Sequence, residues 1–343
     1  MSCLRSALEE LAVGRGPGLF ALVTEGGETV FTGGVGTADL ADPRPIGSED
    51  RFRVASVTKL YTATVVLQLA AEGRLPPASS VEHWLPGLLP DGDRITVEHL
   101  LRMRSGLADY VWAVLGDPPR VARLRRYFSP RDLVRTALAQ LGREEPGRRW
   151  RYSNTDYILL GLIIEQVTGQ PVQDVLRERI FQPLGLTATS MPISDLHLPD
   201  PHVRGYLRMD AETGYVDCTE YTPSEAWTSG AIVSTPPDVA RFLDALLGGR
   251  LLSPAWLAAM RAVEPARMDL EYGMGLFRYH LPDGTALYGH GGVHFGVECY
   301  AFRSDTGRTV VLHQNSWDRV AGAIPRDNPF ICAAFASNEF HEP

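Results

Sequence analysis

Lysine is almost absent from this chain. Of its 343 residues, 33 are basic, and since Lys59 is the only lysine, 32 of these are arginines. Arginine stays protonated in proteins, whereas a desolvated lysine can lower its pKa and act as a base. Lys59 is therefore either kept for its chemistry or the survivor of a general bias toward arginine.

Cysteine is also scarce. Cys3, Cys218, Cys299 and Cys332 are scattered and form no Cys-x-x-Cys pair, which is the spacing typical of metal and redox sites. The sequence therefore indicates neither a metal site nor a disulfide framework.

Long apolar runs are missing as well. No stretch reaches the roughly 18 residues that a membrane-spanning helix needs. Residues 1–10 are amphipathic and acidic rather than a basic head followed by an apolar run, so they do not resemble a secretory signal. Because the sequence starts with Met1, we expect a cytoplasmic protein without a membrane partner.

The overall charge excludes another class of partner. A net charge of −8 argues against a nucleic-acid-binding surface, and 44% hydrophobic residues are ordinary for a globular protein. We therefore expect a small molecule or short peptide as the substrate. The sequence makes no prediction of oligomeric state.

Periodicity places strands near both ends of the chain and helices between them. Spacing and capping signals predict helices over 2–13, about 56–69, 97–104, 130–140, 156–168, 172–180, 237–247 and 328–340. Apolar or β-branched runs predict strands over 19–24, 28–34, 273–279, 286–289, 295–302 and 309–314. We therefore predict an α/β (α+β) chain. Residues 1–75 and 225–343 would form a sheet domain, residues 76–224 a mostly helical domain, with the active site in the cleft between them.

One stretch carries a candidate nucleophile. Ser56 and Lys59 lie three residues apart at the start of a predicted helix, so one helix face brings hydroxyl and amine together. A serine hydroxyl becomes an effective nucleophile when a neighbouring base takes its proton. The N–H groups at the start of a helix can also stabilise an oxyanion. A four-residue pattern arises easily by chance, so its meaning depends on further elements.

Two further elements fit such a centre. Tyr152-Ser153-Asn154 offers a phenol that can carry a proton and a carboxamide that can hydrogen-bond a substrate. Alone, it fits equally a packed tyrosine with Asn154 as a helix N-cap. His290-Gly291-Gly292 lies between two predicted strands and, alone, fits a tight turn with an incidental histidine.

In this order, the three elements resemble the motifs of the serine β-lactamase and DD-peptidase superfamily: Ser-x-x-Lys, Tyr-x-Asn and His/Lys-x-Gly on a strand. The resemblance runs from about residue 5 to 335 and is closest to the class C-like soluble D-alanyl-D-alanine carboxypeptidases. Other matching stretches are 84–90, 94–97, 104–107, 180–184 and 229–231. The resemblance implies a β-lactamase/transpeptidase-like fold, with helices flanking an antiparallel sheet, and no metal or organic cofactor.

The resemblance also implies a covalent mechanism. Ser56 would attack a carbonyl to form an acyl-enzyme, with Lys59 as base or proton relay. Tyr152 would pass the proton to the leaving group and activate the second nucleophile. Asn154 would orient the acyl-side amide of the substrate, and His290 would tune Tyr152 and line the strand side of the site.

The third motif departs from that of the carboxypeptidases. Those relatives typically have His-Thr-Gly-Thr, with an arginine after the Gly-Leu pair of the neighbouring strand. Here the motif is His290-Gly291-Gly292-Val293, and Phe277 follows Gly275-Leu276. Arg278 should point to the opposite strand face, unless the alignment shifts by one residue. A substrate carboxylate would then lose a charge-assisted hydrogen bond worth about 1.5–3 kcal/mol.

Three more positions are candidates for the substrate site. The backbone N–H groups of Val293 and Ser56 would form the oxyanion hole, by the same resemblance. Trp227 resembles a pocket-wall aromatic of the relatives, although a core tryptophan fits as well. Trp112, on the loop after Gly106, is a further candidate for the pocket wall.

These features favour a serine hydrolase acting on a small ester or amide without a free carboxylate beside the scissile bond. One alternative is an acyltransferase of secondary metabolism that passes the Ser56-bound acyl group to an amine or alcohol. A second is a D-alanyl-D-alanine carboxypeptidase. A non-catalytic binding or sensor protein is disfavoured by the joint presence of Ser56, Lys59, Tyr152 and His290.

Overall fold

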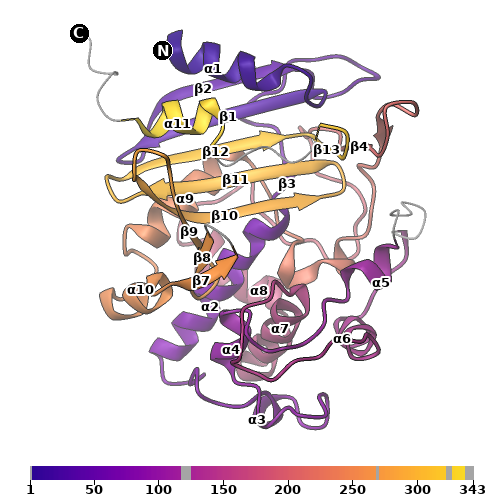
Figure 1. The fold of residues 1–343 in the computed structure, drawn as a ribbon, viewed down its shortest axis with the longest axis vertical. Helices are drawn as coiled ribbons and strands as arrows, with labels where there is room; N and C mark the ends of the chain where they lie inside the picture. Colours follow the sequence, from indigo (N-terminus) through magenta and orange to yellow (C-terminus); the bar gives the residue numbers. More distant parts are fainter. Residues whose placement is uncertain (1, 117–124, 268–269, 322–326, 337–343) are drawn as a thin grey trace.

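An antiparallel sheet of eight strands, in the order β2-β1-β12-β11-β10-β9-β8-β7, forms the centre of the protein (Figure 1). The computed structural model describes residues 2–116, 125–267, 270–321 and 327–336. The strands of this sheet are β1 (Gly18–Glu25), β2 (Glu28–Gly36), β7 (Glu264–Arg267), β8 (Leu270–Tyr272), β9 (Phe277–His280), β10 (Ala286–His294), β11 (Val297–Ser304) and β12 (Arg308–Gln314). Because β1 pairs with β12, the N-terminal hairpin completes a sheet built mainly by the C-terminal part of the chain.

Short strands join distant segments outside this sheet. β3 (Phe52–Arg53) pairs with β6 (Val233–Ser234). β4 (Tyr206–Arg208) lies between β5 (Val216–Asp217) and β13 (Ser316–Asp318). β4 belongs to the part of the chain predicted as a helical domain, yet it pairs with β13 of the sheet part. The domain division at residue 224 stays a prediction.

Helices cover both faces of the sheet. α1 (Ser2–Ala12) and α11 (Pro329–Phe335) lie side by side over one face (Figure 1). The other helices are α2 (Thr58–Ala71), α3 (Val81–Trp84), α4 (Val97–Leu101), α5 (Val111–Leu115), α6 (Pro130–Leu138), α7 (Asn154–Thr168), α8 (Val172–Leu176), α9 (Pro236–Leu247) and α10 (Pro254–Arg261). Among them, α2 is buried along nearly its whole length and α7 from Thr155 to Ile164, so they form the centre of the main core.

Alternate side chains of β1 point into two different hydrophobic cores. Leu19 and Val23 pack with α1 and α11, whereas Phe20 and Leu22 face the larger core that contains α2 and α7. This is the period of two expected when helices cover both faces of a sheet. The turn around Ser56, between β3 and α2, lies on the side of the larger core, which includes Ala55 and Val57.

The structure confirms the N-terminal hairpin and the strands β11 and β12 to within about two residues, the margin expected at element ends. The predicted strand over 273–279 is wrong in its first half, because residues 273–276 form a turn between β8 and β9. The strand predicted over 286–289 continues to His294, so the glycine-rich motif is not a turn. The predicted helix over 328–340 ends at Phe335, and residues 337–340 lie outside the described residues.

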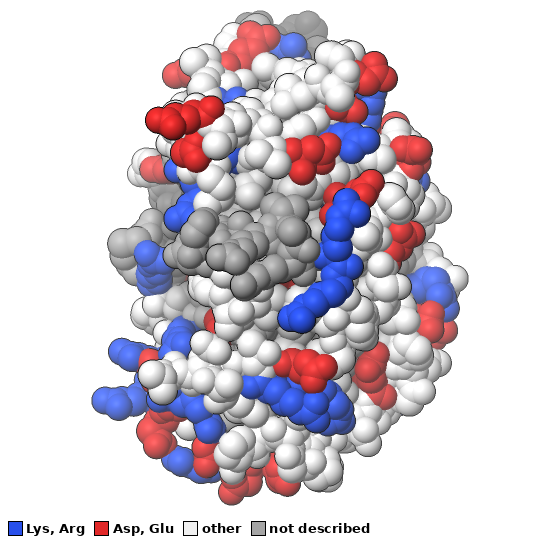
Figure 2. Space-filling model, turned by 90° about the vertical axis from the view of Figure 1, so that its right-hand side faces the viewer, with Lys and Arg blue, Asp and Glu red and all other residues white. Residues whose placement is uncertain are grey.

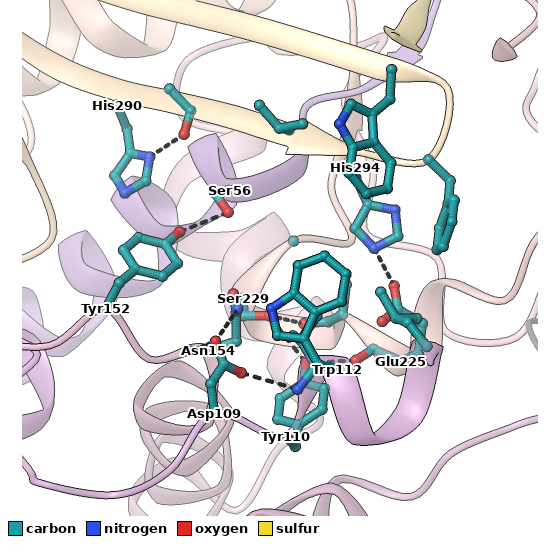
Figure 3. Close-up of a pocket in the computed structure, with 18 of the residues that line it drawn as sticks. Ser56, Asp109, Tyr110, Trp112, Tyr152, Asn154, Glu225, Ser229, His290 and His294 are labelled. Carbon is teal, nitrogen blue, oxygen red and sulfur yellow. Dashed lines mark hydrogen bonds and ion pairs between the residues drawn. The ribbon is translucent and has the colours of Figure 1, made fainter. Parts of the chain in front are cut away.

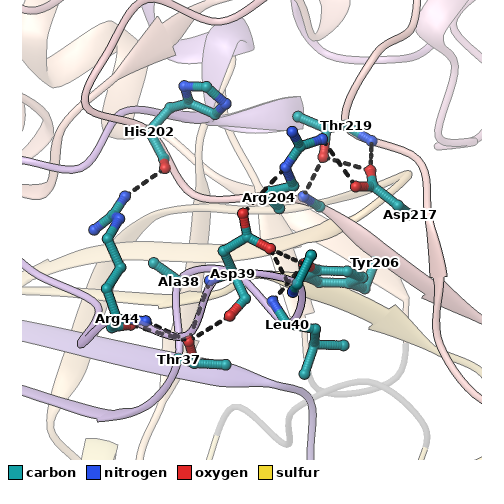
Figure 4. A network of polar contacts seen from close by, with 12 residues as sticks. Thr37, Ala38, Asp39, Leu40, Arg44, His202, Arg204, Tyr206, Asp217 and Thr219 are labelled. Carbon is teal, nitrogen blue, oxygen red and sulfur yellow. Dashed lines mark hydrogen bonds and ion pairs between the residues drawn. The ribbon is translucent and has the colours of Figure 1, made fainter.

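A polar network ties the loop after β2 to β4 (Figure 4). The Tyr206 hydroxyl donates to Asp39 Oδ1 at 3.1 Å, and Arg204 Nε donates to Asp39 Oδ2 at 3.3 Å. Arg44 donates to the backbone oxygen of His202 at 2.6 Å. These contacts hold the segment that leads to β3 and the active-site turn.

Charges of both signs are interspersed over the face shown in Figure 2. No helix among the described residues is long and apolar enough to cross a membrane.

Candidate active site

Ser56 lies in a sharp turn between β3 and α2. Residues 55–57 form one 3-10 turn, and α2 begins only at Thr58, so Ser56 precedes the helix instead of opening it as predicted. Ala55 has a φ of 49°, which is uncommon for a residue with a side chain. The turn places Ser56 in the lining of a cavity.

Lys59 approaches Ser56 from inside the protein. Its side chain is fully buried, and Nζ lies 3.0 Å from Ser56 Oγ. Nζ also donates to Asn154 Oδ1 and to the backbone oxygen of Ser229, each at 2.8 Å. Burial lowers the pKa of Lys59 to about 7, against the opposing effect of the Asp109 carboxylate. In the neutral amine, two hydrogens satisfy the two oxygens, and the lone pair is left for the Ser56 hydroxyl.

Tyr152 contacts Ser56 from the cavity side. Its hydroxyl donates to Ser56 Oγ at 2.8 Å. Burial raises the pKa of the Tyr152 phenol well above its usual range, so the phenol stays protonated at neutral pH. Tyr152, Ser56 and Lys59 thus form one hydrogen-bonded row in which a proton can move from the serine to the amine.

Asn154 connects this row to a carboxylate that the sequence did not reveal. Its Nδ2 donates to Asp109 Oδ2 at 2.8 Å, while its Oδ1 accepts from Lys59. The N-cap of α7 is Ser153, whose hydroxyl accepts from the backbone N–H of Asp156 at 3.3 Å. The Asn154 side chain is therefore not used for capping and stays in the site.

The β10 edge passes close to the active-site turn. A Cβ on Gly292 would lie 2.9 Å from Ser56 N and 2.6 Å from the backbone oxygen of Val54. β9 pairs with β10 only from Ala286 to Gly289. Residues 290–294 therefore run past Ser56 beyond the last β9 pair, next to the cavity.

His290 lines the cavity but does not bond directly to Tyr152 in the described structure. Their rings lie 6.3 Å apart, centroid to centroid. Nδ1 donates to the backbone oxygen of Gly291 at 2.5 Å, and Nε2 is buried without a partner. Burial, and then the nearby Lys59 charge, lowers the pKa of His290 to about 3, so the ring is neutral. Tuning of Tyr152 by His290 stays a prediction.

These groups open into a cavity of about 440 Å³ (Figure 3). The described residues that line it are Ser56, Asp109, Tyr110, Val111, Trp112, Leu115, Tyr152, Asn154, Glu225, Ala226, Ser229, Gly230, Leu270, Phe277, His290, Gly291, Val293, His294, Phe295, Tyr300, Phe302 and Trp317. The predicted positions Trp112, Phe277, Gly291 and Val293 thus line this cavity, and their contact with a substrate stays a prediction.

Two predicted positions lie elsewhere. Gly292 packs against the Ser56 turn instead of lining the cavity, so closely that a Cβ at this position would lie 2.6 Å from the backbone oxygen of Val54. Trp227 is 4% exposed and belongs to the core, where a Cβ on Gly161 would meet its ring at 2.7 Å. The pocket-wall prediction for Trp227 is therefore wrong, because its neighbours Glu225 and Ala226 form that wall.

Arg278 is turned away from the cavity, as the alternation of strand β9 predicted. Its guanidinium donates twice to Glu271, each time at 2.7 Å. Phe277 faces the cavity, with its ring centroid 4.9 Å from that of His290. A one-residue shift of the alignment, which would have put Arg278 in the cavity, is therefore excluded by the structure.

Sequence reasoning missed three polar residues of the cavity. Asp109 is part of the Asn154 contacts, and Glu225 Oε1 lies 2.6 Å from His294 Nε2. Asp109 follows the Ser105-Gly106-Leu107 stretch and His294 follows Val293, so nearness to known motifs was the available signal. Among the described residues, no group of three or more His, Cys, Asp or Glu side chains could hold a metal ion.

Comparisons with known proteins show the family and the fold. The family model described as Beta-lactamase matches residues 4–328. The D-stereospecific amidohydrolase from Streptomyces sp. is 32% identical and superposes with a TM-score of 0.89, covering 98% of this chain and 99% of that one.

Curated relatives are matched over a smaller share of their length. Penicillin-binding protein 4* of Bacillus subtilis (strain 168) is 29% identical over 85% of this chain and 66% of its own. Esterase EstB of Burkholderia gladioli is 29% identical over 78% of this chain and 76% of its own. The chain belongs to the beta-lactamase family of serine hydrolases.

Proposed function

We propose that the protein hydrolyses a small amide or ester that carries no free carboxylate beside the scissile bond. The observation that carries this proposal is the composition of the cavity around the Ser56–Lys59–Tyr152 row. Its described lining residues include the carboxylates of Asp109 and Glu225 but no lysine or arginine. A substrate carboxylate would be desolvated there without a cationic partner, which is costly.

The proposed reaction has two acyl-transfer steps. Lys59 takes the Ser56 proton as Oγ attacks the carbonyl carbon, and the N–H groups of Ser56 and Val293 would hold the oxyanion. The bond to the leaving amine or alcohol then breaks, and the Tyr152 hydroxyl passes a proton to it. In the second step the Tyr152 phenolate takes a proton from water as the water oxygen attacks the acyl carbon. The bond to Ser56 Oγ then breaks, the acid leaves, and the Lys59 ammonium returns its proton to Oγ.

Amides of D-amino acids are the first substrates to test, because the Streptomyces relative is a D-stereospecific amidohydrolase. Simple esters come next, because EstB is an esterase. Acyl transfer to an amine or alcohol and D-alanyl-D-alanine carboxypeptidase activity are the alternatives, and the same experiment separates them.

The experiment is intact-protein mass measurement combined with product analysis. Wild type and Ser56→Ala are incubated separately with D-phenylalanine amide, p-nitrophenyl acetate, a penicillin and a D-Ala-D-Ala peptide. We expect Ser56-dependent turnover of the amide or ester and slow or no reaction with the other two. Rapid penicillin acylation with release of D-alanine would overturn the proposal in favour of a carboxypeptidase. The ester is also incubated with an added primary amine, and acylated amine in place of free acid would then indicate a transferase.

A further inference from the structure

Two histidines of β10 mark opposite ends of the cavity. His290 and His294 are four residues apart, so they lie about 13 Å apart along the strand. Gly292, midway between them, is the residue that packs against Ser56. Figure 3 shows the result: Tyr152 and His290 lie on one side of Ser56, and His294 and Glu225 lie on the other. A carbonyl held at Ser56 therefore has one substituent toward each end.

The proposed function assigns a role to each end. Tyr152 passes a proton to the leaving group, so the leaving group must lie at the end that holds Tyr152 and His290. The acyl group must then extend toward His294 and Glu225. This assignment rests on the proposed function and makes the second end the acyl end of the cavity.

Glu225 is rigidly held at the acyl end. The residue is 1% exposed, and its Oε1 lies 2.6 Å from His294 Nε2. Its backbone oxygen accepts from the buried Tyr110 hydroxyl at 2.6 Å. The His294 ring is stacked on that of Tyr221, with centroids 4.9 Å apart. A carboxylate fixed in this way is preorganised for a ligand rather than free to turn away.

The charge at this end favours a cation. Arg53 is buried behind Tyr221, with its guanidinium 4.2 Å from the centroid of that ring; it donates to backbone oxygens and interacts with the Glu225 carboxylate only through space. A neutral His294 that donates from Nε2 leaves the negative charge on Glu225. Trp112 and Trp317 line the same cavity, and aromatic faces attract ammonium groups.

We propose that Glu225, held by His294, binds an ammonium group on the acyl part of the substrate. From Gly292 to His294 the strand advances about 7 Å. The ammonium would accordingly lie several bonds beyond the carbonyl carbon, in contrast to an amine on the adjacent carbon. The substrate class is thus an amide or ester of an acid that bears a distal amine.

The test compares matched p-nitroanilides. The anilide of 5-aminopentanoic acid carries the distal ammonium, that of hexanoic acid replaces it by a methyl group, and that of D-alanine carries an adjacent amine. We expect kcat/KM for the 5-aminopentanoyl substrate to exceed that for the hexanoyl substrate by about ten- to hundredfold, the range of a charge-assisted hydrogen bond.

Three variants test whether Glu225 causes the preference for the 5-aminopentanoyl substrate. Glu225→Gln should remove it, whereas Glu220→Gln, which removes an accessible carboxylate of the same segment, should leave it unchanged. Glu225→Asp shortens the side chain by one methylene and should shift the preference toward the 6-aminohexanoyl anilide, which a purely structural role would not do. It also serves as the test if Glu225→Gln fails to fold.

Binding provides a readout independent of turnover. Boronic acids with a 4-ammoniobutyl or a pentyl chain, titrated calorimetrically, should differ in Kd by a similar factor in wild type and not in Glu225→Gln. Ser56-dependent hydrolysis without any dependence on Glu225 would overturn the subsite and leave the hydrolase standing. Absence of both hydrolysis and boronate binding would overturn both.

Discussion

Lys59 reaches Ser56 from the interior of the protein, with Nζ 3.0 Å from Oγ and no exposed surface on the lysine side chain. This position makes the single lysine of the chain a candidate base. Burial disfavours the charged ammonium, and the surrounding oxygens of Asn154 and Ser229 hold the amine in place. The proposed base is thus part of the core instead of being exposed at the surface.

Replacing Lys59 should nearly abolish acylation. In Lys59→Arg a permanently charged guanidinium occupies the position of the base, and it cannot take the Ser56 proton. General-base catalysis contributes about 10²–10⁴-fold, so we expect kcat to fall by that factor in both Lys59→Arg and Lys59→Ala. Steady-state hydrolysis of p-nitrophenyl acetate checks this. An activity in Lys59→Arg close to that of wild type would exclude Lys59 as the base.

Activity should rise with pH through a midpoint near the Lys59 pKa. Because burial lowers this pKa to about 7, the amine is protonated and inactive below that pH and free above it. The Asp109 charge opposes the shift, so Asp109→Asn should move the midpoint of kcat/KM to lower pH. A pH profile of the variant beside wild type checks the direction. A midpoint that does not move would mean that another group controls the profile.

The contact between Ser56 and Lys59 was predictable from sequence because it depends on short-range spacing. Ser56 and Lys59 meet three residues apart although Ser56 precedes the helix, since a 3-10 turn also aligns positions i and i+3. The order of the motifs predicted that Tyr152 and His290 lie near Ser56, and all three line the same cavity. The alternation of a strand correctly turned Arg278 away from Phe277.

The acyl end of the cavity was not predictable in the same way. Glu225 and His294 are far apart in the sequence and meet only through the fold, and neither lies within a recognised motif. Trp227 was misassigned because sequence cannot tell a wall residue from a core residue one or two positions away. Strands of two or three residues, such as β3 and β6, are too short to create a periodic pattern.

The contact of Gly292 with the Ser56 turn predicts a strong effect of one added methyl group. In Gly292→Ala the Cβ would lie 2.6 Å from the backbone oxygen of Val54, so β10 or the turn must move. Overpacking of this kind costs about 1–3 kcal/mol, and the displaced Ser56 should lower kcat at least tenfold (about 1.4 kcal/mol).

A matched glycine provides the control for this prediction. A Cβ on Gly47 would meet only Asp50 Oδ2, at 3.8 Å, so Gly47→Ala should change neither Tm nor kcat appreciably. Thermal unfolding and ester hydrolysis of both variants measure the two effects. A Gly292→Ala protein as stable and active as wild type would contradict the close contact.

Phe277 provides the sharpest test of the missing carboxylate site. It lines the leaving-group end of the cavity beside His290, where the resemblance to carboxypeptidases places an arginine. Phe277→Arg should therefore give a substrate carboxylate a charge-assisted partner, worth about 1.5–3 kcal/mol or about ten- to hundredfold in affinity. We expect faster acylation of Ser56 by a penicillin, measured by intact mass, in this variant than in wild type or Phe277→Leu.

Arg278→Gln should not affect the reaction, because that guanidinium is bound to Glu271 on the opposite face. If Arg278→Gln slowed penicillin acylation while Phe277→Arg did not accelerate it, Arg278 would be the carboxylate-binding residue, and the absence of carboxylate recognition would be refuted.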